Sequence, residues 1–252
     1  MVERLGPEEQ ERLREAGRVA AEVLAELGRS VAPGLSTADL DAMAQDAIAA
    51  RGACSSQFGH QGFTGHVCTS RNDVVCHGVP SSQEILQPGD LINIDVTVEV
   101  DGFHGDTCRT FPVLDGSTPL ANNPRRLLRA VDEALAAAIA VVRDGARVGD
   151  IGAAVIAVAR RHEVSVVREY CGHGIGRAMH MDPQIPHVGV AGRGPRLRSG
   201  MAFTIEPMLN LGSAECTLDS DGWTVRTVDG HWSAQSEHTV LVHDTHCEIV
   251  TA

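Results

Sequence analysis

The sequence predicts an α+β fold in which helices cover an antiparallel sheet. Amphipathic helical segments followed by strand-forming segments occur in each half of the chain, and a strong two-residue turn joins two β-rich segments. With 252 residues, 43% of them hydrophobic, the chain is long enough to bury the core of one large domain. We therefore expect one compact unit over residues 1–252.

Two amphipathic helices are expected at the N-terminus. Apolar residues follow one helix face from Pro7 to about Arg29, and Pro7 suits a first helical turn. Ser36 is a suitable cap for a second helix, and Gly52 is its expected end. These helices are packing elements and carry no chemistry.

The next segment, from Leu91 to Pro112, is rich in strand-forming residues. LINIDVTVEV and FHGDTCRTF lie on either side of Asp101-Gly102, which is a strong signal for a two-residue hairpin. Ala- and Leu-rich helices are expected from Pro124 to about Arg143 and from Asp150 to about His162. Residues 164–167 are expected to begin a strand, and QSEHTVLVHD predicts the last strand of the chain.

Charge and cysteine content argue against several classes of protein. A formal charge of -12 without a block of basic residues makes nucleic acid an unsuitable partner. The N-terminus is charged from its third residue and no later stretch approaches 18 apolar residues, so we expect no signal peptide, no membrane span and a cytoplasmic location. The seven cysteines lack CxxC spacing and are expected to be reduced thiols.

Two aspartates are expected on one face of the hairpin. If Asp101 and Gly102 form the turn, Thr97 lies opposite Asp106. Asp95 and Asp106 are then diagonal neighbours, with their Cβ atoms about 7 Å apart. Burying such a pair without compensation would cost several kcal/mol, so a divalent cation between them is the simplest explanation. The alternative is two solvated aspartates on an exposed face, but the apolar residues around Asp95 resemble a covered strand.

Three further ionisable groups lie among apolar or glycine neighbours: His173 in CGHGIGRAMH, Glu206 in FTIEPM and Glu237 in SAQSEHTVLV. Each is a weak signal alone, because isolated histidines and acids are more often structural. Together with the two aspartates they form an oxygen-rich set with one nitrogen donor, which suits two divalent ions such as Mn, Fe or Co. Two ions that share and ionise a water molecule fit metal-assisted hydrolysis.

Five motifs in order, NDVVCHGVP, NIDVTVEVDGFHGDT, YCGHGIGRAMH, FTIEPM and DGWTV, resemble those of the type I methionine aminopeptidases. That family has the pita-bread (creatinase/aminopeptidase) fold of peptidase family M24. The resemblance implies a curved antiparallel sheet covered by two pairs of helices, as a single catalytic metallopeptidase domain over residues 1–252. It also implies removal of the N-terminal methionine from nascent proteins and peptides, with a preference for small second residues.

The resemblance further implies roles for individual residues. Asp95 would bind one metal, Asp106 and Glu237 would bridge two, and His173 and Glu206 would complete the second site. The ions implied are Co, Mn, Fe or Zn.

Substrate contacts are implied in the same way. His77 and His180 match family histidines near the scissile bond, where His180 would stabilise the developing oxyanion and His77 would hold the leaving-side amide. Glu206 is the natural proton shuttle. An apolar methionine pocket would be formed by Phe63, Cys68 and Trp223. The chain departs from the family pattern beside that pocket, at Gln57, His60 and Met179.

Two alternatives stay open. One is a proline-directed aminopeptidase or prolidase-like peptidase, although such relatives usually carry a large additional N-terminal domain, whereas the catalytic-type domain here is expected to begin almost at Met1. The other is a non-catalytic pita-bread binding module, although all five ligand positions are filled. We expect a monomer; contact with the ribosome would suit an enzyme that trims new chains, but no motif indicates it.

Overall fold

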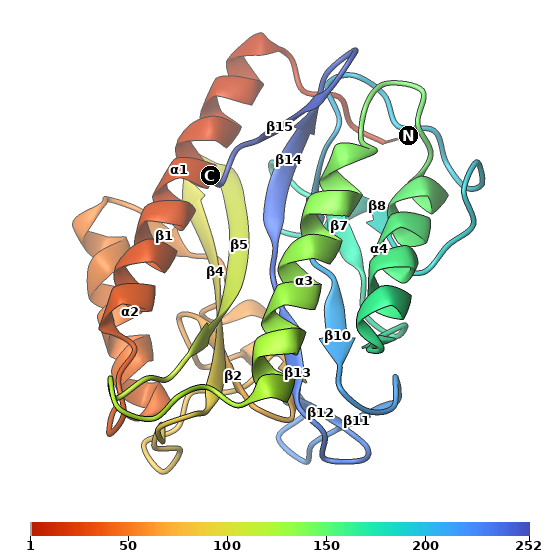
Figure 1. Cartoon of the computed structure of the whole chain (residues 1–252). Coiled ribbons are helices and arrows are strands. Elements are labelled where there is room, and N and C mark those ends of the chain that lie inside the picture. Colours follow the sequence, from red (N-terminus) through yellow and green to blue (C-terminus); the bar gives the residue numbers. More distant parts are fainter. Residues whose placement is uncertain (1) are drawn as a thin grey trace.

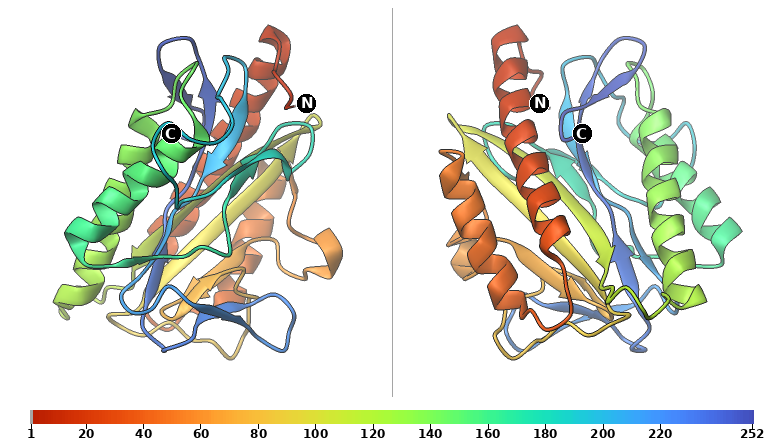
Figure 2. Two further views of the ribbon diagram at one scale, coloured as in Figure 1. Left: turned by 90° about the vertical axis from the view of Figure 1, so that its right-hand side faces the viewer. Right: turned by 60° about the vertical axis from the view of Figure 1, so that its left-hand side comes forward.

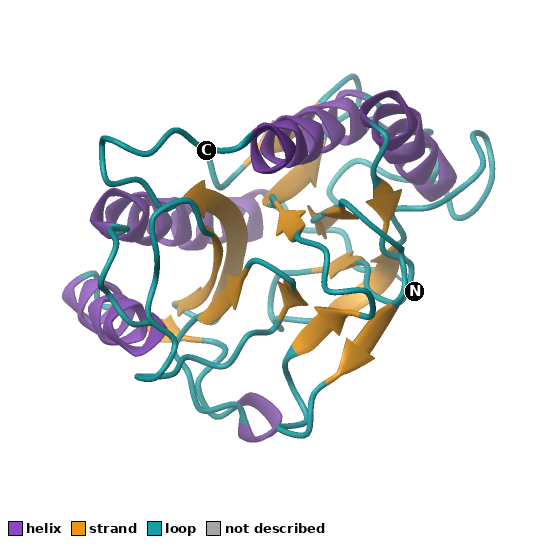
Figure 3. Ribbon diagram, turned by 60° about the horizontal axis from the view of Figure 1, so that its bottom comes forward, coloured by secondary structure: helices purple, strands orange, loops and turns teal. Residues whose placement is uncertain are grey.

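Two pairs of helices cover one side of an antiparallel β-structure in the computed structural model, which describes residues 2–252 (Figure 1). The first pair is α1 (Pro7–Ser30) and α2 (Thr37–Ala50), and the second pair is α3 (Asn122–Ala140) and α4 (Val148–His162). A view from below shows both pairs on the outside of the strands (Figure 3). The predicted α+β architecture with paired helices in each half is confirmed.

Among the described residues, the strands form four sheets, and every strand pair is antiparallel. One sheet has the order β1-β4-β2 with β5 paired to β4, and another has the order β15-β14-β9-β7-β8. The two smaller sheets are β13-β10-β6 and β11-β12-β3. A bridge between Arg109 and Ser236 joins the two halves.

The bounds of the strands, and of one short 3-10 helix, are as follows in chain order: β1 (Cys54–Ser55), η1 (His60–Gly62), β2 (Cys68–Arg71), β3 (Val74–Cys76), β4 (Leu91–Val100), β5 (Phe103–Pro112), β6 (Ser165–Val166), β7 (Gly172–Gly174), β8 (Met181–Ile185), β9 (Ala202–Ile205), β10 (Met208–Asn210), β11 (Cys216–Leu218), β12 (Val225–Thr227), β13 (Ser233–Gln235), β14 (His238–Val242) and β15 (Cys247–Ile249).

The predicted helix positions are correct within about three residues. Ser36 caps α2 as expected, because its hydroxyl accepts a hydrogen bond from the Asp39 backbone N–H at 3.1 Å. The helix α4 begins two residues before the predicted start at Asp150. The Asp150 carboxylate accepts a hydrogen bond from the Arg147 N–H at 2.7 Å, so Asp150 lies in the first turn and caps it. The end of α3 precedes the predicted Arg143 by three residues.

The hairpin of β4 and β5 has the predicted register. Val100 pairs with Phe103 and Thr97 pairs with Asp106. Asp101 and Gly102 have φ values of 49° and 80°, the left-handed pair that a tight turn with the twist of its strands requires.

The alternation of side chains along β4 separates packing from chemistry. Ile92, Ile94, Val96 and Val98 belong to one apolar cluster with residues of α1 and α2. The residues between them, including Asp95 and Thr97, therefore point to the other face of the sheet. A Cβ atom on Gly105 of β5 would lie 2.4 Å from the Ala16 backbone, so α1 lies directly against this hairpin. The helices thus cover the back of the strands that carry the aspartates.

All seven cysteines are free thiols, as expected. Within residues 2–252, no helix combines the length and the apolar character needed to cross a bilayer.

One ion pair ties the C-terminal strand to the first helix and gives a test of the fold. Arg14 of α1 holds Glu248 of β15 through two bonds, Nε to Oε1 at 2.7 Å and Nη2 to Oε2 at 2.8 Å. This hydrogen-bonded pair, with His243 as a further partner, lowers the pKa of Glu248 from 4.5 to about 2. A carboxylate with a depressed pKa stabilises the fold above its unfolded pKa, and the stabilisation is lost as the pH falls toward its folded pKa.

We expect Glu248→Gln to lower the free energy of unfolding by about 1 kcal/mol at pH 6. The difference from the unmodified protein should shrink as the pH falls from about 4.5 toward 3. Urea denaturation at several pH values measures it. A difference that stays constant over this range would show that the ionised pair contributes nothing to stability.

Candidate metal centre

Five predicted ligands from both halves of the chain line one cavity of about 540 Å³. Asp95 and Asp106 project from the hairpin, and His173 projects from β7. Glu206 follows β9 directly, and Glu237 lies between β13 and β14. The structure therefore brings together side chains that are up to 142 residues apart in the sequence, from Asp95 to Glu237.

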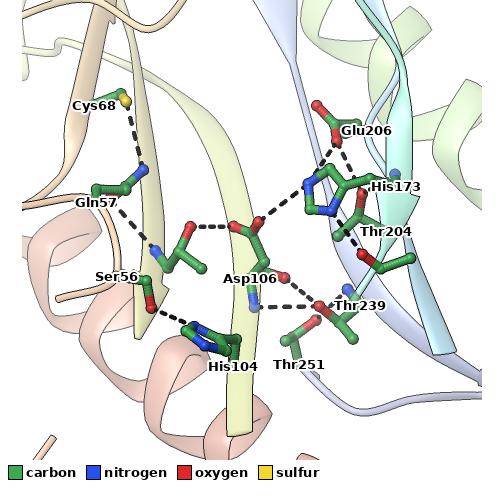
Figure 4. Close-up of polar contacts among 12 residues, drawn as sticks. Ser56, Gln57, Cys68, His104, Asp106, His173, Thr204, Glu206, Thr239 and Thr251 are labelled. Carbon is green, nitrogen blue, oxygen red and sulfur yellow. Dashed lines mark hydrogen bonds and ion pairs between the residues drawn. The ribbon is translucent and has the colours of Figure 1, made fainter. Parts of the chain in front are cut away.

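The tightest part of this cluster surrounds His173. Its Nε2 lies 3.6 Å from Asp106 Oδ2 and 3.6 Å from Glu206 Oε1 (Figure 4). One ligand atom each from Asp106, His173 and Glu237 lie within 4.8 Å of one another. His173 Nδ1 lies 3.1 Å from the Gly174 carbonyl, which assigns the ring proton to Nδ1 and leaves the Nε2 lone pair free for a ligand.

Neighbouring side chains orient the carboxylates. Thr97 Oγ1 donates to Asp106 Oδ1 at 2.7 Å. Thr204 Oγ1 donates to Glu206 Oε1 at 2.9 Å (Figure 4). Gln235 Nε2 donates to the other Glu206 oxygen at 3.1 Å. In contrast, Asp95 Oδ1 is buried without a hydrogen-bond partner. A buried carboxylate oxygen of this kind needs a compensating charge or donor.

The electrostatics of the cluster favour cations. Burial raises the pKa of all four carboxyl groups, that of Asp106 to about 7, and the charge of Asp106 raises the pKa of the other three further. Burial lowers the pKa of His173 to about 4, so its imidazole is neutral. None of the described residues that line the cavity is a lysine or arginine. Divalent cations fit this set of oxygens and one imidazole nitrogen.

The two predicted substrate histidines lie on the wall of the same cavity. The His180 ring lies 4.3 Å from the His173 ring, and the His77 ring lies 5.6 Å from that of Tyr170. Burial lowers the pKa of His77 to about 4, and partial desolvation of its ring at the cavity wall lowers that of His180 to about 4; neighbouring histidines add to both shifts. Each is therefore a neutral ring that can donate one N–H.

An apolar recess adjoins the carboxylates. Phe63 and Trp223 meet edge to face at 5.1 Å, and the buried Cys68 and Met179 also line the cavity. Gln57 adds an amide, whose Nε2 lies 3.4 Å from Cys68 Sγ. The three predicted pocket residues thus share one cavity with the carboxylate cluster.

Some residues of the site were not identified from the sequence, namely Tyr170, Thr204 and Gln235. Thr204 precedes Glu206 by two residues, the spacing that also relates Thr97 to Asp95 and places side chains on one face of an extended segment. Gln235 precedes Glu237 by two residues in the same way. This spacing was a usable signal, whereas none indicated Tyr170.

A family comparison agrees with this centre: residues 11–244 match the model of metallopeptidase family M24. The chain belongs to metallopeptidase family M24. Among similar M24 proteins, methionine aminopeptidase A of Synechocystis sp. is 47% identical over 247 residues, which cover 98% of this chain and 96% of the relative. The methionine aminopeptidase of Escherichia coli strain K12 is 46% identical over 246 residues, which cover 97% of this chain and 92% of that relative.

A solved M24 structure agrees with the fold. The crystal structure of methionine aminopeptidase from Rickettsia prowazekii superposes with a TM-score of 0.96 at 42% identity, and the match covers 100% of both chains. The pita-bread fold of M24 peptidases is therefore the fold of this protein, as the resemblance implied.

Proposed function

We propose that this M24 protein removes the N-terminal methionine from peptides and nascent proteins, with a preference for small second residues. The observation that carries the proposal is the gathering of four carboxylates and one histidine beside an apolar recess. The 46% to 47% identity to methionine aminopeptidases over nearly the whole chain supports it. Residues 1–252 would form one catalytic domain, since both halves contribute to the cavity.

Two divalent ions are the cofactor that we propose, because their charges balance those of four carboxylates. Asp95 would hold one ion, His173 and Glu206 would hold the other, and Asp106 and Glu237 would contribute to both. Co, Mn, Fe and Zn all accept such ligands. When bound, the ions supply a Lewis acid that polarises the first carbonyl group and makes water more acidic.

The remaining steps are assigned to side chains of the cavity. Glu206, whose oxygens are held by Thr204 and Gln235, carries a proton from the attacking water to the leaving amine. The ring N–H of His180 stabilises the carbonyl oxygen of the first residue, and that of His77 holds the amide on the leaving side.

Substrate selection is assigned to the apolar recess. Its residues Phe63, Cys68 and Trp223 would receive the methionine side chain, because an aromatic pair and a thiol suit a flexible thioether. We also propose that the protein acts in the cytoplasm as a monomer.

Hydrolysis of Met-Ala-Ser tests the proposal. After chelation the protein should be inactive, and Mn or Co should restore turnover, with Met-Ala-Ser preferred over Leu-Ala-Ser by at least about tenfold. A preference for peptides with proline in second position would instead assign a proline-directed peptidase. A protein that holds no stoichiometric metal and releases no methionine would be a binding module.

A further inference from the structure

Exposed residues of the catalytic cavity lie at β8 and at Glu169. The carboxylates and Phe63 are at its buried end, whereas Asp182 and Gln184 of β8 line the same cavity and are exposed. His180, directly before β8, is also exposed. A polypeptide whose first residue occupies the buried end must leave the cavity past exposed residues of this kind.

A second groove adjoins the cavity at β8. Asp182 and Gln184 line both the catalytic cavity and a second, open groove of about 580 Å³. We call it the β8 groove, and its other members include Pro186, Val188, Val190 and Arg193. β8 lies toward the right of Figure 1, the side that faces the viewer in the left panel of Figure 2.

The β8 groove has the surface that an extended peptide needs. Its walls are largely valine, proline and glycine, and Val190 is 67% exposed. β8 is also the outermost strand of its sheet, with β7 as its one strand partner in the described part of the chain. Pro183 interrupts the N–H donors along this edge, so the apolar wall, rather than the strand edge, offers the contacts for alternate side chains of a passing chain.

We propose that the β8 groove binds the leaving part of the polypeptide substrate, from about its third residue onward, through apolar side chains. This inference rests on the proposed function, because a peptide must enter the cavity by its N-terminus. The five residues of β8 correspond to about 16 Å of extended chain. A substrate of about eight residues therefore reaches the far end of the groove, whereas a tripeptide does not.

Peptide length and a variant at Val190 test the proposal. The substrates are Met-Ala-Ser, the octapeptide Met-Ala-Ser-Val-Ser-Val-Ser-Gly, and the same octapeptide with glycine in place of valine. The valine octapeptide should have a kcat/KM about tenfold above that of the other two, mainly through a lower KM. Val190→Asp should abolish this advantage and change Met-Ala-Ser turnover less than twofold.

Val228→Asp is the matched control, since Val228 is a 57% exposed valine outside both cavities. It should leave all three substrates unchanged. Equal kcat/KM for the three peptides, or an octapeptide advantage that survives Val190→Asp, would overturn the proposal. A dimer that Val190→Asp dissociates, with unchanged peptide kinetics, would overturn it in favour of a second copy of the chain. No hydrolysis of Met-Ala-Ser by the unmodified protein would contradict the proposed function itself.

Discussion

Asp106→Ala should reduce the hydrolysis of Met-Ala-Ser by more than about 10³-fold and lower the bound metal content. Asp106 lies at the centre of the cluster: one oxygen is held by Thr97 and the other lies 3.6 Å from the His173 nitrogen. Its loss removes a ligand that we assign to both ions. Turnover at saturating Mn and elemental analysis of the dialysed protein measure the two effects.

The fold should survive this substitution. Asp106 is buried beside three other carboxyl groups, and its charge raises the pKa of each. Its removal therefore relieves repulsion in the metal-free protein, whose unfolding free energy should stay the same or rise. Asp46→Ala, at an exposed position of α2, is the control and should change neither metal content nor turnover. Full metal content in Asp106→Ala would contradict the assigned centre.

His77→Ala should reduce turnover by about 10²-fold while the metal content stays at its normal value. The His77 ring contacts Tyr170 and Trp223, at 5.6 Å and 6.3 Å between ring centroids. Within the described residues, no ion pair or hydrogen bond links it to the carboxylates. Its role in our proposal is to hold the leaving-side amide. The effect should appear in kcat more than in KM, since this contact strengthens as the peptide bond breaks.

The backbone at His77 requires a second variant. His77 has a φ of 55°, in the left-handed region that alanine tolerates poorly and asparagine tolerates better. His77→Asn keeps this conformation and an N–H donor, so it should recover part of the lost turnover. Loss of metal in either variant would show that our division of roles is wrong. Unchanged turnover in both would make His77 a structural residue.

Local features of the sequence were sufficient to predict the hairpin. The Asp101-Gly102 turn determines the register, and the register determines that Asp95, Thr97 and Asp106 share a face. The helix ends were less exact, because Asp150 lies inside the first turn that it caps. His77 could be singled out among twelve histidines only through the family resemblance, since no periodicity or neighbouring residue marks it.

The residue types and their local spacing were enough to predict the kinds of ligand, the face of the hairpin that carries two of them, and the family. The folded structure was needed to show that His173, Glu206 and Glu237 meet those aspartates, and that a second groove shares Asp182 and Gln184 with the cavity. The difference comes from the range of the interactions involved. Turn and strand geometry relate residues a few positions apart, whereas the approach of β7, β9 and β14 to the hairpin depends on how the helix pairs pack against both halves.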